Sequence, residues 1–90
     1  MTVRYSARAL RHLEQIHEYV ARDKQAAADE TIEGILSAAR RLLVHPKLGR
    51  EGIVKGTREL VHPPFVLVYR IKRDAISLEA VFHDNQRYHF

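Results

Sequence analysis

Apolar residues in the first half of the chain recur at helical spacing. Residues 2–5 alternate and predict a short strand, and Ser6 behind them is a favourable N-cap. Leu10, Leu13, Ile16 and Val20 then follow at steps of three and four residues, which predicts a helix of about 15 residues. This pattern favours a strand that leads directly into an amphipathic helix.

A second apolar stripe of the same period runs through residues 28–43. Asp23 lies in the break between the two stripes and is a candidate N-cap for the second helix. Gly34 within the stripe is unfavourable in a helix and indicates close packing against a neighbour. His45 and Pro46 end the helix. Because the connection is short, the two helices are expected to form an antiparallel hairpin.

After a glycine-containing loop at residues 47–56, the period becomes strand-like. Strands are predicted at residues 57–61, 65–71 and 76–83, and the second is apolar on both faces, which favours a central position. The order is therefore β-α-α-β-β-β. We expect an α+β fold with a helical hairpin packed on a small, mostly antiparallel sheet. The length of 90 residues predicts a single domain over residues 1–90.

Composition removes several classes of function. The chain has no cysteine, so disulfides, thiolate metal sites and cysteine nucleophiles are excluded. The longest uninterrupted apolar run, residues 65–69, is far shorter than a membrane helix of about 20 residues. The start of the chain lacks an apolar signal segment, so a cytoplasmic protein without a membrane partner is expected. His12 and His17 are spaced for different sides of a helix, and no phosphate-binding glycine motif occurs, so we expect no metal and no cofactor.

The formal charge is +4, from 15 basic and 11 acidic residues. Residues 1–50 carry nine basic and six acidic groups, and residues 51–90 carry six and five, so the excess looks evenly spread. Such a charge favours an acidic or nucleic-acid partner without choosing between them. Solubility alone explains it equally well.

Four segments, in this order, resemble the RelE/ParE toxin superfamily of bacterial toxin–antitoxin modules, and most closely its ParE-type, plasmid-stabilisation branch. They are residues 23–50, the segment Gly56-Thr57-Arg58-Glu59-Leu60, the apolar Tyr-Arg strand at residues 65–71, and Val81-Phe82-His83 with Arg87 four residues on. The resemblance implies a growth-arresting toxin that is neutralised by an acidic antitoxin encoded beside it. ParE-type members inhibit DNA gyrase, whereas RelE-type members cleave mRNA on the ribosome. An inactive module that only binds an antitoxin is a third alternative.

Ribosome-dependent mRNA cleavage requires a base, an acid and cations that stabilise the transition state. If the chain is RelE-type, Arg58, His83 and Arg87 are the catalytic candidates, and Arg70 and Tyr88 are candidates for binding the target. Each has a structural alternative. Arg58 is expected to pair with Glu79 across the sheet, Arg70 to be solvated or to contact the antitoxin, and His83 to end a strand. Tyr69 is expected in the core.

The balance of charge in residues 51–90 is low for docking into ribosomal RNA, where phosphate neutralisation supplies most of the affinity. The long hairpin and the loop after it also resemble ParE-type chains. We therefore rank gyrase inhibition first, which requires no catalytic residue. Arg8, Arg11 and Arg22 on the hairpin are candidate contacts, with an ordinary solvated face as the alternative. The antitoxin is expected to use apolar grooves beside the hairpin and an exposed sheet edge.

Overall fold

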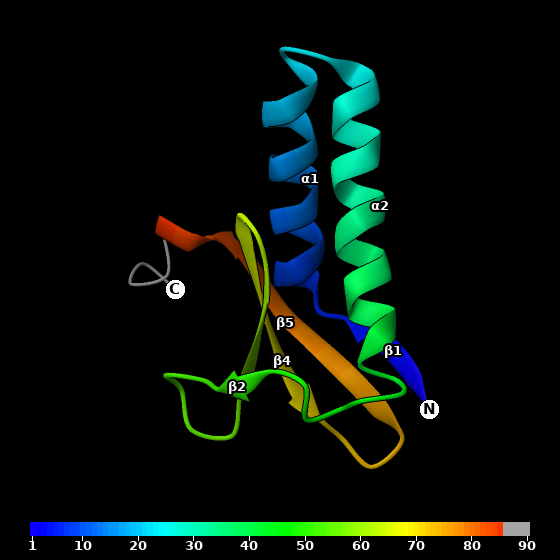
Figure 1. The fold of residues 1–90 in the computed structure, drawn as a ribbon, viewed down its shortest axis with the longest axis vertical. Helices are drawn as coiled ribbons and strands as arrows, with labels where there is room; N and C mark the ends of the chain where they lie inside the picture. Colours follow the sequence, from blue (N-terminus) through cyan, green and yellow to red (C-terminus); the bar gives the residue numbers. More distant parts are fainter. Residues whose placement is uncertain (86–90) are drawn as a thin grey trace.

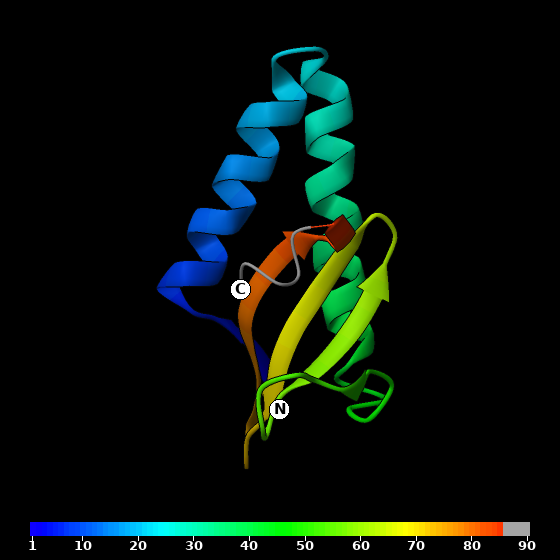
Figure 2. The ribbon, with the colours of Figure 1, turned by 90° about the vertical axis from the view of Figure 1, so that its left-hand side faces the viewer.

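The computed structural model describes residues 1–85 and contains two helices and five strands in the described part (Figure 1). The helices form an antiparallel hairpin that packs on one face of the sheet (Figures 1 and 2). The predicted α+β class and order are confirmed, with one additional strand, β2. In chain order the elements are β1 (Thr2–Tyr5), α1 (Ala7–Ala21), α2 (Gln25–Arg41), β2 (Arg50–Glu51), β3 (Arg58–His62), β4 (Phe65–Ile71) and β5 (Ala75–His83).

The sheet has the strand order β1-β5-β4-β3-β2. β2 to β5 are joined in antiparallel pairs, and β1 returns parallel to β5. β4 lies at the centre of the sheet, as its apolar character on both faces predicted. β2 was not predicted, because two residues inside a loop are too few to display a period. The turn between β3 and β4 contains a cis peptide bond between Pro63 and Pro64.

The two helices begin differently. Ser6 caps α1 as expected, because its Oγ accepts a hydrogen bond of 3.0 Å from the amide of Ala9. The predicted Asp23 cap of α2 is wrong. The amides of Asp23 and Lys24 both donate to Val20 O to close the turn after α1, and Lys24 in extended backbone becomes the N-cap without a side-chain bond.

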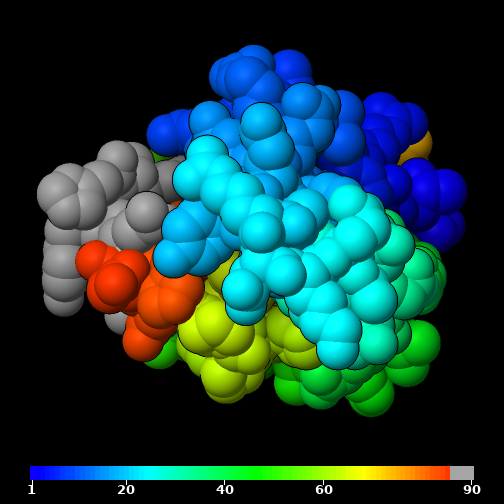
Figure 3. Space-filling view, turned by 90° about the horizontal axis from the view of Figure 1, so that it is seen from above, coloured from blue at the N-terminus to red at the C-terminus, as the bar shows by residue number. Residues whose placement is uncertain are grey.

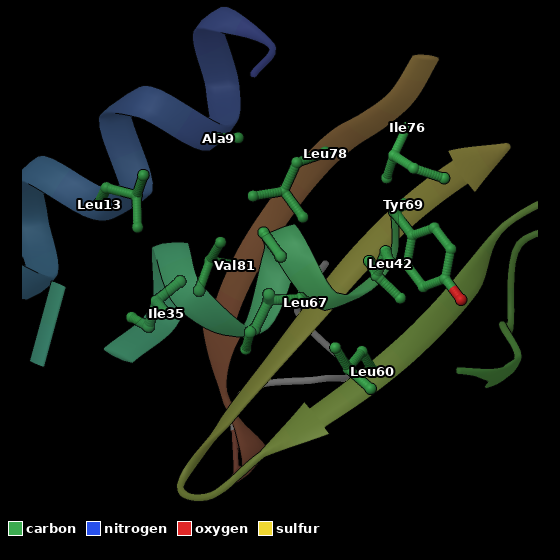
Figure 4. Close-up of a cluster of buried hydrophobic side chains, with 12 residues drawn as sticks. Ala9, Leu13, Ile35, Leu42, Leu60, Leu67, Tyr69, Ile76, Leu78 and Val81 are labelled. Atoms are coloured by element: carbon green, nitrogen blue, oxygen red, sulfur yellow. The ribbon is translucent and has the colours of Figure 1, made fainter. Parts of the chain in front are cut away.

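The core lies between the hairpin and one face of the sheet (Figure 4). Leu13, Ile35 and Leu42 enter it from the helices and meet Leu67 and Leu78 from β4 and β5. Tyr69 is fully buried there, which confirms its expected place. Leu10, by contrast, is 47% exposed, because Ala9 occupies the inner position on that turn of α1.

The hairpin extends beyond the sheet (Figures 1 and 2). Two contacts with the sheet are at His12, whose ring meets the Val81 amide, and at Gly34, where an added Cβ would lie 3.2 Å from His62 Nε2. The close packing expected at Gly34 is therefore confirmed. We call residues 14–33 the hairpin tip. No helix in the described range is long and apolar enough to cross a membrane.

Candidate functional site

The connection between α2 and β3 lies at the end of the molecule opposite the hairpin tip (Figure 1). We call residues 42–57 the connecting loop. The Tyr69 hydroxyl of β4 donates to Pro46 O at 2.6 Å and accepts from the Gly49 amide at 3.0 Å. A Cβ at Gly49 would lie 2.8 Å from the Tyr69 ring, so glycine is required there. A buried side chain of the central strand therefore fixes this loop.

Arg58 holds the same loop from β3. Its Nε donates to Gly49 O at 3.0 Å, and its Nη2 donates to Lys47 O at 3.3 Å. The expected pairing of Arg58 with Glu79 is wrong. Arg58 lies opposite Tyr69 on the face that carries the helices, whereas Glu79 pairs with Arg70, whose Nε lies 3.6 Å from Glu79 Oε1. Alternation along the strands places Arg58 and Arg70 on opposite faces.

Glu59 anchors the next part of the loop. Its side chain is only 4% exposed, and its Oε1 accepts from both Nε and Nη2 of Arg50 at 3.2 and 3.1 Å. Its Oε2 accepts from the Ile53 amide at 3.3 Å. Because a buried carboxylate requires such partners, Glu59 and Arg50 hold β2 against β3. The segment Gly56-Thr57-Arg58-Glu59-Leu60 thus builds the loop.

Arg70 and His83 occupy different ends of the sheet. Arg70 Nη1 donates to Lys55 O at 3.3 Å, so this residue also contacts the loop. His83 ends β5 opposite Phe65, with ring centroids 6.0 Å apart in an edge arrangement, and its Nδ1 accepts from the Asn85 amide at 3.4 Å.

The structure does not bring Arg58 and His83 together. Their partners on β4 are Tyr69 and Phe65, which are four residues apart, or about 13 Å along a strand. Arg87 and Tyr88 lie outside the described residues. Among residues 1–85, no group of three or more histidine or acidic side chains is arranged to hold a metal ion.

Acidic and basic residues are unevenly distributed between the hairpin tip and the rest of the molecule. Counting them in residues 1–50 and 51–90 does not reveal this difference. The hairpin tip contains six of the 11 acidic residues but only two of the 15 basic ones. The rest of the chain therefore has thirteen basic and five acidic residues. The molecule has an acidic tip and a basic body, and Figure 3 looks down on that tip. Arg8 and Arg11 belong to the body and Arg22 to the tip, so these three candidates do not form one surface.

One histidine contact joins α1 to the sheet. His12 Nδ1 accepts a hydrogen bond of 3.1 Å from the Val81 amide of β5. Burial lowers the pKa of His12, and the charges of Arg8 and Arg11 lower it further. This contact requires a neutral ring, because a protonated Nδ1 cannot accept. The sequence pattern was used only to reject His12 as a metal ligand and did not predict this role.

A different polar cluster joins the helices in the tip. His17 Nε2 lies 2.8 Å from Asp29 Oδ1, and Gln25 Nε2 donates to the same oxygen at 3.2 Å. The hydrogen bond with His17 is the largest cause of the lowered pKa of Asp29, with Gln25 contributing in the same direction. Both bonds are exposed, so the cluster is accessible to water and salt.

The connecting loop and the end of β4 border a shallow, solvent-open cleft of about 710 Å³. Val44, Leu48 and Ile71 line it and are 74%, 43% and 40% exposed. The remaining lining residues are His45, Pro46 and Lys47. No period in the sequence marks this cleft, because it forms where the loop meets a strand that is distant in sequence.

Residues 3–88 match the family described as ParE toxin of type II toxin-antitoxin system, parDE. The chain is 38% identical over 88 residues to protein Y4kP of Sinorhizobium fredii, which is named as a candidate toxin, with 96% of this chain and 91% of that protein covered. It is 33% identical over 91 residues to Toxin RelE3 of Caulobacter vibrioides, with 96% and 97% covered.

Two solved structures share the fold. One is a chain of the chromosomal ParDE system from P. aeruginosa, with a TM-score of 0.81, 23% identity, and 92% of this chain and 95% of that chain covered. The other is YafQ from E. coli, with a TM-score of 0.56, 17% identity, and 92% of each chain covered. At these identities the likeness concerns the fold.

Proposed function

Because this chain belongs to the ParE toxin family of type II toxin–antitoxin systems, we propose that it arrests growth by inhibiting DNA gyrase. Family membership makes it the toxin of such a system and implies a cognate antitoxin as its partner. Inhibition of this kind requires a binding surface on the toxin and no acid–base chemistry. The basic body, which carries the charge excess, is the part suited to a complex of protein and DNA.

The proposal is supported chiefly by the hydrogen bonds of the Arg58 side chain, which go to the connecting loop. An RNA-cleaving site requires cations that face the reacting phosphate. Arg58 instead directs its Nε and Nη2 to the carbonyl oxygens of Gly49 and Lys47, and Arg70 is paired with Glu79. His83 lies at the far end of the sheet from Arg58. This arrangement supports a positioning role for Arg58 and a function without RNA cleavage.

RelE-type cleavage of mRNA on the ribosome is the second candidate. The relative named Toxin RelE3, at 33% identity, favours it. In that case His83 and Arg87 would supply proton transfer and phosphate binding with Arg58, while Arg70 and Tyr88 would contact the RNA. The test must therefore include both targets.

A supercoiling assay with purified gyrase and relaxed plasmid tests the proposal. The folded chain, free of antitoxin, is expected to block supercoiling and to accumulate cleaved DNA. Adding the product of the adjoining reading frame, as candidate antitoxin, should restore supercoiling. A growth-arresting chain that leaves gyrase unaffected and cleaves mRNA in a purified translation system would replace the proposal with the second candidate. Cells that tolerate the folded chain would indicate an inactive antitoxin-binding module.

A further inference from the structure

We propose that the cleft between the connecting loop and β4 is a docking site for an acidic segment of the antitoxin that carries apolar side chains. The cleft contains three of the nine exposed large hydrophobic residues in the described part of the chain, namely Val44, Leu48 and Ile71. Clustered exposure of this kind marks interaction sites on small proteins. This inference rests on the proposed function, because it takes the partner to be an antitoxin.

Basic residues adjoin this apolar lining. Lys47 lies in the cleft, and Lys72 and Arg73 directly follow Ile71 in the chain. No acidic side chain of the described residues lines it. Asp74, the acidic residue nearest in sequence, pairs with Arg4 at 3.7 Å. Acidic residues on the partner would complement the positive charge of Lys47, Lys72 and Arg73.

The wall of the cleft is fixed before any partner arrives. Tyr69 is fully buried and bonds Pro46 O and the Gly49 amide on either side of Leu48. Arg58 holds Lys47 O from the neighbouring strand. A preformed wall lowers the entropy lost on binding. A shallow apolar surface beside a fixed loop is the kind of surface on which an extended or helical peptide segment docks.

The absence of cysteine in the sequence allows a direct test with single thiols. Val44 and Tyr19 are 74% and 73% exposed, so Val44→Cys and Tyr19→Cys place matched thiols in the cleft and on the acidic tip. Each variant is alkylated with iodoacetamide, free and in complex with the adjoining reading frame's product. Mass spectrometry of the toxin chain gives the rates. Complex formation should slow alkylation of Val44→Cys by about tenfold or more and change Tyr19→Cys by less than about twofold.

Unchanged alkylation of Val44→Cys within a stable complex would overturn the docking proposal and leave the proposed function intact. Failure of the unmodified toxin to form any complex with that product would also overturn the docking proposal, whereas the supercoiling assay tests the proposed function separately. Affinity provides a second measurement: Val44→Glu should weaken binding by about tenfold, and Val44→Lys by less, because only the glutamate repels an acidic segment. Equal affinities for Val44→Glu and the unmodified chain would likewise contradict the proposal.

Discussion

Different interactions stabilise the hairpin tip and the connecting loop. The tip has regular helical backbone, and its two helices share an apolar stripe and one exposed polar cluster around Asp29. The connecting loop has only the two residues of β2 in regular structure, yet buried polar side chains of β3 and β4 fix it at Pro46, Gly49 and Ile53.

The difference lies in where the backbone N–H and C=O groups of each region find their hydrogen-bond partners. Helical backbone satisfies its own hydrogen bonds, so the tip requires only apolar contact between its helices. Loop backbone must find partners elsewhere, and here Tyr69, Arg58 and Glu59 provide them. A polar substitution should therefore cost more in the sheet beneath the loop than in the tip.

Leu42 lies at the junction of α2 and the connecting loop, and its substitution should have the largest effect. Leu42 is fully buried, and Leu42→Asp places a charge in the core at a cost of several kcal/mol. That is comparable with the whole stability of a domain of this size, about 5–10 kcal/mol. Circular dichroism on heating should show no cooperative transition. Val44→Asp, at a position 74% exposed, is the control and should stay folded. A folded Leu42→Asp chain would contradict the core assignment.

Tyr69→Phe should separate the two regions. The substitution keeps the ring but leaves Pro46 O and the Gly49 amide without their partner, at a cost of about 1–3 kcal/mol. Amide hydrogen exchange should accelerate in residues 46–57 and remain unchanged in residues 14–33.

Arg58→Ala should accelerate exchange in the same loop. If Arg58 acts only by holding the loop, both variants should lose toxicity in proportion to the lost protection. Full loop protection with no toxicity in Arg58→Ala would instead indicate direct contact with the target.

Acid should weaken the contact between α1 and the sheet. The pKa of His12 is lowered by burial and by Arg8 and Arg11, so the folded chain binds its proton less readily than the unfolded chain. Its contribution to stability is fully present above the unfolded pKa of about 6.5, and it is lost as pH falls through the lower folded pKa. His12→Gln cannot titrate there and should show a flatter dependence of urea midpoint on pH between pH 7 and 5. Identical slopes would remove His12 from this role.

Asp29→Asn in the tip should have the smallest effect. Asp29 is exposed and its hydrogen bond with His17 lies in solvent, so the thermal midpoint at neutral pH should not change measurably. The pKa of Asp29 is lowered, so any contribution is present above its ordinary value of 3.8 and lost as pH falls through the folded value. A loss as large as that of Tyr69→Phe would show that the tip also depends on polar contacts.

Periodicity predicted both helices, the central place of β4 and the burial of Tyr69, because each depends on local spacing and burial pattern. It predicted neither β2 nor the Lys24 cap, since two-residue ladders and turn closure have no period. For the candidate site, the sequence identified Arg58 and Arg70 as notable but gave Arg58 the wrong partner. The partner of Arg58 depends on which face of the sheet its side chain occupies. That face is set by the register of β3 and β5 on the intervening strand β4, which the sequence pattern does not specify.

The sequence by itself determined the α+β fold and the resemblance to a toxin superfamily, because the apolar period and short motifs are properties of neighbouring residues. Only the tertiary structure decided that Arg58 and Tyr69 hold one loop, that the acidic tip lies away from the body that carries the basic excess, and that Val44 and Ile71 share a cleft. These features join residues distant in the chain. Their physical basis is the packing of the hairpin on the sheet and the register of its strands, which no single segment encodes.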